Sequence, residues 1–175
     1  MRAKVFYFIV TWGLTHSINA QETKYPIAQD VESVNGLVSA LYASISGDAG
    51  EPRDWERFKS LFADGALLIP TKEKDDGTNG YKTMTPLEYI ENAGPYFQDN
   101  GFYEYELYRE TNDYGRITHI FSTYASKHGQ QDAEPFNRGI NSIQLFYDSN
   151  RWWILSIYWA HESEKNPIPE RYLPK

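Results

Sequence analysis

Cysteine is absent from the 175-residue sequence, which excludes disulfides, thiolate metal sites, iron–sulfur clusters and cysteine nucleophiles. Basic residues are few, with 17 lysines and arginines against 24 aspartates and glutamates. The resulting net charge of −7 argues against a nucleic-acid partner, which requires a basic face. No His-x-His or His-Glu-x-x-His spacing occurs, so no metal site is predicted. Phosphate-binding glycine loops, dinucleotide fingerprints and Gly-x-Ser-x-Gly motifs are also missing.

No apolar run approaches the roughly 20 residues that cross a bilayer, and the N-terminus has instead the layout of a secretory signal peptide. Arg2 and Lys4 precede an apolar run over residues 5–14, and small or polar residues follow as far as Ala20. We therefore predict cleavage near Ala20, export to the periplasm or the medium, and no membrane anchor. The alternative is a buried N-terminal strand or helix. After cleavage, residues 21–29 form a polar lead into the folded domain.

Helical patterns fill the first half of the remaining chain. After Asp30, apolar residues recur every three or four positions as far as Ile45, which predicts a helix capped by Asp30 and stopped by Gly47. A second, short helix is predicted from Asp54, with Trp55 on its apolar face.

The third predicted helix has the most specific local signature in the chain. Thr85 is placed to cap it, Pro86 occupies the first helical position, and Glu88 completes a capping box. Pro95 lacks a backbone N–H and restricts the residue before it. We therefore predict that this helix ends or kinks at Gly94.

The second half of the chain changes to strand patterns rich in β-branched and aromatic residues. Four strands are predicted there, at residues 102–111, 117–127, 139–147 and 151–161. A short buried strand is predicted at residues 66–70, and the charged, glycine-containing segment 71–82 is expected to be a mobile loop. The proline-containing tail, residues 163–175, is expected to be extended. Helices followed by an antiparallel meander, in a chain of this length, predict a single α+β domain over residues 30–162.

This order of elements resembles the nuclear transport factor 2-like (SnoaL-like) superfamily, and it is most similar to exported members without an assigned reaction. Residues 34–70, 115–124 and 138–159 carry the resemblance. It implies a cone-shaped half-barrel, with the N-terminal helices packed on a curved, mainly antiparallel sheet around a pocket for a small molecule. Family members include steroid isomerases, scytalone dehydratase and polyketide cyclases, which use no cofactor, and also binding and dimerisation modules. The resemblance therefore implies no cofactor and leaves open whether the chain is an enzyme.

One departure from the family concerns the carboxylate base of the steroid isomerases. In our alignment its position falls at Ile69 or Pro70, neither of which can take a proton. Isomerase chemistry of that kind is therefore not expected here.

His119 is the leading catalytic candidate, because imidazole titrates near neutrality and suits proton transfer. It shares a face of the predicted strand 117–127 with Ile117 and Phe121. The alternative is a core histidine whose ring nitrogens are satisfied by its neighbours. Tyr124 lies on the opposite face of this strand and is a candidate proton donor.

Glu104 and Glu106 are the carboxylates predicted to orient that imidazole, since they share a face of the neighbouring strand in the meander. Such residues are otherwise solvated or paired with arginines, here Arg109 or Arg138. Arg138 is itself a candidate clamp for an anionic ligand, with a rim salt bridge as the alternative. Six residues are candidate ligand contacts, as polar groups or aromatic side chains of the predicted pocket: Asn141, Gln144, Arg138, Trp159, Phe121 and Trp55.

Aromatic residues lie on both faces of the last two predicted strands, which a sheet with one solvated face does not require. One face is expected to line the pocket and the other to form a homodimer surface. We therefore predict an exported domain that binds a small, largely apolar molecule. The alternatives are a cofactor-free lyase or isomerase that uses the histidine and a carboxylate, and a module that only dimerises or docks.

Overall fold

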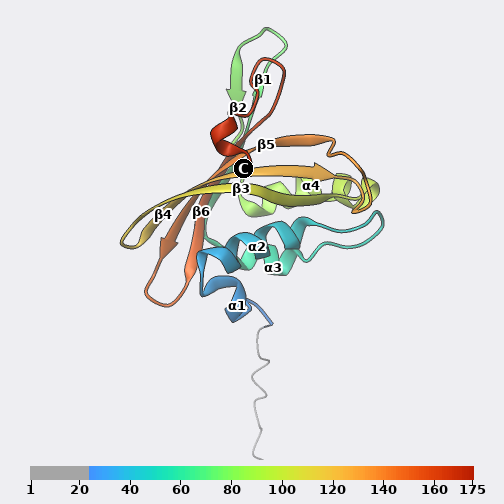
Figure 1. Cartoon of the computed structure of the whole chain (residues 1–175). Coiled ribbons are helices and arrows are strands. Elements are labelled where there is room, and N and C mark those ends of the chain that lie inside the picture. Colours follow the sequence, from blue (N-terminus) through green and yellow to red (C-terminus); the bar gives the residue numbers. More distant parts are fainter. Residues whose placement is uncertain (1–23) are drawn as a thin grey trace, which may run out of the picture.

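The computed structural model describes residues 24–175, in which four helices pack against a six-stranded sheet (Figure 1). The helices are α1 (Ala28–Val31), α2 (Val34–Ile45), α3 (Trp55–Ser60) and α4 (Pro86–Asn100). The strands are β1 (Phe62–Glu73), β2 (Asn79–Tyr81), β3 (Tyr103–Tyr114), β4 (Ile117–Lys127), β5 (Asn137–Tyr147) and β6 (Trp152–His161). The predicted signal peptide lies outside the described residues, so export stays a prediction.

The strands follow the order β2-β1-β6-β5-β4-β3, and every neighbouring pair is antiparallel except β1 with β6. This mixed, open sheet with its helices confirms the predicted α+β class. The four long strands lie within three residues of their predicted bounds, and β4 matches them at both ends. None of the helices in the described part of the chain has the length and apolar character needed to span a membrane.

The start predicted for the second helix and the capping box predicted for the third are confirmed. At the start of α3, the Asp54 carboxylate accepts the backbone N–H of Arg57 at 3.1 Å. At the start of α4, Thr85 Oγ1 accepts from Glu88 N at 3.2 Å, and Glu88 Oε2 accepts from Thr85 N at 2.7 Å. This reciprocal pair is the capping box.

The single helix predicted from Asp30 is in fact two helices. Ser33 caps α2, because its Oγ accepts the N–H of Gly36 at 3.0 Å. Asp30 instead lies buried in α1, where its two carboxylate oxygens accept from Arg57 of α3, each at 2.7 Å. The aspartate therefore joins two helices rather than capping one.

The predicted end of the third helix at Gly94 is also wrong, because α4 continues through Pro95 to Asn100. Pro95 is exposed, so water can replace the hydrogen bond that a proline cannot donate. One turn further on, the ring of Phe97 stacks on Phe102 with centroids 4.0 Å apart. This packing holds the last part of α4 against the sheet.

Residues 71–82 form a β-hairpin rather than a mobile loop. Strand β1 extends to Glu73 and pairs with β2. The turn between them contains Gly77 with a φ of +78° and is closed by a 2.7 Å hydrogen bond from Lys74 N–H to the carbonyl of Thr78. Most side chains of this hairpin are exposed, so its sequence carries no apolar alternation that would reveal strands.

The C-terminal tail, predicted to be extended, folds back over the sheet and is in part helical. It contains a short 3₁₀ helix, Glu170–Tyr172. Thr123 Oγ1 donates to the carbonyl of Tyr172 at 2.7 Å, and the ring of Tyr172 lies 5.2 Å from that of Phe121. The tail therefore covers part of the face opposite the helices, which we call the outer face. A homodimer through the rest of that face stays a prediction.

The core lies between the helices and the other face of the sheet, which we call the inner face. Its buried apolar residues come from both layers and include Leu37, Leu41, Phe58, Ile120, Ile143 and Ile157. In β4 the residues with even numbers, from Thr118 to Ser126, are all buried. Phe121, from the odd-numbered set, packs on the tail. Alternation therefore places His119 on the outer face.

Candidate functional site

A cavity of about 340 Å³ lies between α2, α4 and the inner face of the sheet. Most of its wall is apolar or aromatic, and its larger side chains include Leu41, Tyr89, Phe97, Phe102, Phe136 and Trp159. Tyr89 of α4 and Trp159 of β6 meet edge to face, with ring centroids 6.2 Å apart. A mainly apolar chamber with a few polar groups is typical of a small-molecule site.

Glu104 of β3 is the one carboxylate among the described residues that line this cavity. Ser126 Oγ donates to Glu104 Oε2 at 3.1 Å, and Asn141 Nδ2 donates to Oε1 at 3.4 Å. Burial nevertheless dominates, because it disfavours the charged form, and it raises the pKa of Glu104 to about 7. Near neutral pH this carboxyl group is therefore poised between accepting and donating a proton.

A second polar cluster joins Tyr124, Asn137 and His161. Tyr124 Oη and Asn137 Nδ2 each lie 2.8 Å from Nδ1 of His161. Loss of hydration lowers the pKa of His161, and burial together with the nearby charge of Glu104 raises the pKa of Tyr124. Both shifts favour the neutral forms, so this cluster supplies uncharged hydrogen-bonding groups to the cavity.

Gly139 is the residue that allows this cluster to form. Tyr124, Gly139 and His161 are register partners in one row across β4, β5 and β6. A Cβ atom at position 139 would lie 2.5 Å from Tyr124 Oη and 2.4 Å from the carbonyl oxygen of Ala160. The tyrosine therefore reaches across the central strand only because that strand carries no side chain there.

Tyr89 presents a hydroxyl group without a protein partner. Among residues 24–175 no side chain or backbone group forms a hydrogen bond with Tyr89 Oη; the residue is half-buried and lines the cavity, and no fully buried polar side-chain atom of the described residues lacks a partner, so this hydroxyl is accessible from the cavity. Burial and the charge of Glu104 raise the pKa of Tyr89. A neutral donor is thus directed into the cavity near the carboxyl group, where a ligand can accept its proton.

The predicted pairing of His119 with a carboxylate is wrong. His119 lies on the outer face, where its Nε2 is 3.1 Å from Ser142 Oγ and its ring packs on Phe121 with centroids 5.7 Å apart. Its register partner in β3 is Asn112, eight residues along the strand from Glu104. The even-numbered face of β4, which carries Tyr124, lines the cavity instead.

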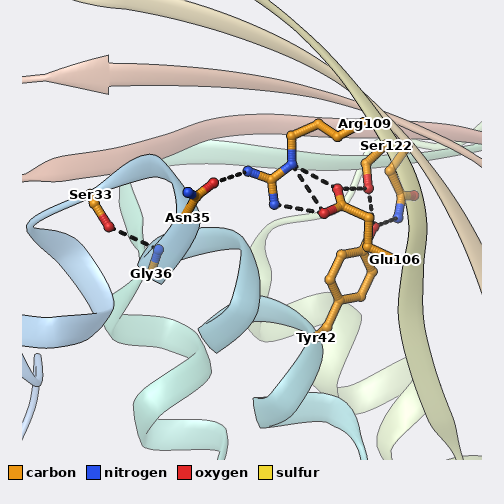
Figure 2. A network of polar contacts seen from close by, with 8 residues as sticks. Ser33, Asn35, Gly36, Tyr42, Glu106, Arg109 and Ser122 are labelled. Atoms are coloured by element: carbon orange, nitrogen blue, oxygen red, sulfur yellow. Dashed lines mark hydrogen bonds and ion pairs between the residues drawn. The ribbon is translucent and has the colours of Figure 1, made fainter.

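Glu106 lies outside the cavity in an ion pair, which is the alternative that the sequence left open. Arg109 Nη2 donates to Glu106 Oε2 at 2.7 Å, and Ser122 Oγ donates to Oε1 at 2.5 Å (Figure 2). A register shift in β3 between Glu106 and Tyr108 brings Arg109 to the same face as Glu106. This carboxylate is therefore fully engaged with protein groups.

The six candidate ligand contacts divide between the two faces of the sheet. Asn141 and Trp159 line the cavity. Gln144 is exposed on the outer face, Phe121 packs there on the tail, and Arg138 pairs with Glu162 at 2.7 Å.

Trp55 does not line the cavity but packs behind its wall. Its ring lies 5.7 Å from Phe58 and 6.4 Å from Phe97, both of which do line it.

Two cavity residues, Tyr89 and His161, were not among the sequence candidates. His161 is the last residue of β6 and is exposed, so neither its position nor its surroundings in the sequence indicate that it lines a cavity. A usable signal was the glycine at position 139 within a strand of large residues, since such a glycine marks a close approach. In the described part of the chain, no group of three His, Cys, Asp or Glu side chains is placed to hold a metal ion.

The sequence matches no family model and no curated protein. Solved structures share the fold at low identity. A protein of unknown function with a cystatin-like fold from Nostoc punctiforme has a TM-score of 0.56 and 10% identity, over 75% of this chain and 90% of that chain. A chain from Novosphingobium aromaticivorans, assigned as the β subunit of an aromatic-ring-hydroxylating dioxygenase, has a TM-score of 0.57 and 14% identity, over 81% and 97%.

A third similar structure, from Xanthomonas campestris, is assigned as a calcium/calmodulin-dependent protein kinase II association domain. Its TM-score is 0.54 at 15% identity, over 75% of this chain and 86% of that chain. These likenesses confirm the fold that the family resemblance implies. Because the three proteins differ in their assigned roles and the identities are low, they show the fold alone.

Proposed function

We propose that this domain, which has the cystatin-like α+β fold of the nuclear transport factor 2-like superfamily, binds a small, largely apolar molecule with one uncharged oxygen group. The observation that carries the proposal is the unpartnered hydroxyl of Tyr89 beside the carboxyl of Glu104 in an apolar cavity. A ketone or alcohol oxygen placed between them would accept from the Tyr89 hydroxyl, which has no protein partner among the described residues. We name this feature the Tyr89–Glu104 corner.

The wall of the cavity indicates the body of the ligand. A volume of about 340 Å³ falls at the lower end of the range for small-molecule sites, roughly 300–1,000 Å³. Aromatic side chains make up much of the wall, and they pack best on a flat ring system in offset or edge-to-face geometry. We therefore expect a ligand of one or two rings.

The charges around the cavity indicate that the ligand is not an anion. None of the described residues that line it is a lysine or arginine, and Glu104 is acidic. Arg138, the clamp predicted for an anionic ligand, is paired with Glu162 instead. A buried anion without a cation would be strongly disfavoured.

A thermal-shift comparison of four naphthalenes tests the proposal. Naphthalene, 2-naphthol, 2-acetylnaphthalene and 2-naphthoate share one ring system and differ in the polar group. At about 100 times its dissociation constant, a bound ligand adds roughly 2.7 kcal/mol, which raises the Tm of a domain of this size by about 5–10 °C. We expect the alcohol and the ketone to stabilise most, naphthalene less, and naphthoate least. No shift with any compound, or the largest with naphthoate, would contradict the proposal.

A second candidate function is proton transfer on the bound molecule. The observation that favours it is the pKa of about 7 for Glu104, which suits a general base at neutral pH. The predicted histidine–carboxylate mechanism is then replaced by Glu104 as base, with Tyr89 as the donor to the ligand oxygen. In D₂O we expect the methyl protons of 2-acetylnaphthalene to exchange with wild-type protein and not with Glu104→Gln, as followed by proton NMR. Equal exchange rates with both proteins would remove this candidate and leave binding alone.

A further inference from the structure

Five side chains form a continuous chain of hydrogen bonds that begins at Asn141 in the cavity wall. Four of them, Tyr42, Ser122, Glu106 and Arg109, are labelled in Figure 2. Asn141 Nδ2 donates to Tyr42 Oη at 3.1 Å, and Tyr42 Oη lies 2.7 Å from Ser122 Oγ. Ser122 Oγ donates to Glu106 Oε1 at 2.5 Å, and the Glu106 carboxylate is held by Arg109. The chain thus begins beside the cavity carboxyl and ends on an ion pair between the sheet and α2.

The ion pair fixes the direction of every bond in this chain. Arginine can only donate, and the Arg109 Nε and Nη2 atoms contact both oxygens of Glu106 at 2.7–3.1 Å, so that carboxylate only accepts. Ser122 must therefore donate its one proton to Glu106. Tyr42, whose neighbour Ser122 has no further proton, must donate to Ser122. The only role left for Tyr42 toward Asn141 is that of acceptor.

This direction decides how the amide of Asn141 is placed. An asparagine side chain has an NH₂ end and an oxygen end of nearly the same shape, so packing alone does not choose between them. Because Tyr42 accepts, the NH₂ end faces both Tyr42 and Glu104, and its second N–H points to Glu104 Oε1 at 3.4 Å. A reversed amide would place its oxygen against the carboxylate.

We propose that Ser122, acting through Tyr42, determines which end of the Asn141 amide faces the cavity, and that these three are positioning residues for the carboxyl group of Glu104. The inference rests on the proposed function, in which Glu104 serves the bound molecule. It adds that the half-buried pair of Glu106 and Arg109 controls the chemistry of a cavity that it does not line.

The reversed amide would change the proton affinity of Glu104 in a known direction. An amide N–H beside a carboxylate favours its charged form, and an amide oxygen favours the protonated form. The other titratable groups near Glu104 are Tyr42 of α2, Tyr89 of α4, Tyr124 of β4, Glu106 of β3 itself and His161 of β6; of these, only Tyr42 is hydrogen-bonded to the Asn141 amide.

Ser122→Ala tests the proposal, because it deprives the buried Tyr42 hydroxyl of its acceptor. The hydroxyl proton of Tyr42 then finds an acceptor only if the Asn141 amide reverses and presents its oxygen. The titration of Glu104 is followed by carbon-13 NMR of labelled glutamate carboxyls, assigned with Glu104→Gln. We expect the proton affinity of Glu104 to rise by about threefold or more in Ser122→Ala.

The double variant Tyr42→Phe/Ser122→Ala is the decisive comparison. It removes the hydroxyl that drives the reversal, so we expect the titration of Glu104 to return to that of Tyr42→Phe alone. It also leaves no unpaired hydroxyl, so it is expected to fold if the single variant does not. If the two substitutions instead acted only through independent losses of packing, their effects on the titration of Glu104 would add.

Ser126→Ala is the matched control. It removes a hydrogen bond made directly to Glu104, so its effect on the titration should persist when Tyr42→Phe is added. An unchanged titration in Ser122→Ala, or additive effects in the double variant, would overturn the inference. Because no ligand enters this experiment, its failure and the failure of ligand binding are separate results.

Discussion

Arg53→Met is expected to lower the free energy of unfolding by about 3–5 kcal/mol, because it leaves buried carbonyl oxygens without donors. Arg53 is 7% exposed, and its five N–H groups donate to five backbone carbonyls. Those carbonyls belong to the last residue of α2, to the segment that follows it and to α4: Ile45, Gly47, Asp48, Glu51 and Phe97. One side chain thus holds the turn and α4 together, next to the cavity wall.

Urea denaturation of Arg53→Met and of Arg116→Met measures this effect. Arg116 is exposed in the turn between β3 and β4, so the same substitution there is expected to change the free energy by less than about 0.5 kcal/mol. A loss below about 1 kcal/mol for Arg53→Met would show that water or neighbouring groups replace the guanidinium.

Glu104→Gln is expected to stabilise the protein at alkaline pH. The pKa of Glu104 is about 7 in the folded protein against 4.5 as its ordinary value, so the folded state binds this proton more tightly than the unfolded state does. Below pH 4.5 the carboxyl group is protonated in both states and does not lower the free energy of unfolding. As the pH rises through 7, the carboxyl group lowers the free energy of unfolding by an increasing amount. At pH 8.5 the difference of 2.5 pH units corresponds to about 3 kcal/mol.

The pH dependence of unfolding, measured for both proteins, distinguishes this effect from better packing. Between pH 4.5 and 8.5 the wild type is expected to lose about 3 kcal/mol more than Glu104→Gln does. Parallel pH profiles would contradict the buried state of this carboxyl group. A residue that lowers the stability of the folded protein at its own position is typical of a functional site.

The strands of this protein could be predicted well because their sequences are both apolar and bounded by turns. The β4 bounds and the alternation of its faces follow from its residues alone. Which face turns toward the helices does not, since His119, Ile117 and Phe121 suit a core as well as Tyr124 and Ser122 do. The choice depends on the tail, which covers Phe121 from the other side.

The failures in the helical half have local physical causes. Asp30 has the right chemistry for a cap, but an ion pair with Arg57 uses it elsewhere. Pro95 would end an isolated helix, and the packing of Phe97 against Phe102 outweighs one lost hydrogen bond. Propensity is a weak guide wherever tertiary contacts decide.

The candidate site could be predicted only in part, because it is built from rows across strands. Glu104 and Tyr124 were selected from their own strands, and both line the cavity. Their neighbours depend on strand register and helix packing. Gly139 lies between Tyr124 and His161 in one row of the sheet, and α4 contributes Tyr89. Residues brought together by pairing and packing have no common spacing in the sequence.

The central claim, that the cavity holds a small molecule, is tested most directly by filling it. Ala93 lines the cavity from α4, so Ala93→Phe places a ring inside it, whereas Ala43→Phe makes the same change on the exposed side of α2. Calorimetric titration of 2-acetylnaphthalene is expected to give equal affinities for the wild type and Ala43→Phe. Ala93→Phe is expected to bind at least about 100-fold more weakly, a loss of about 2.7 kcal/mol. Equal affinity in all three proteins would contradict the account, because the ligand would then bind outside the cavity.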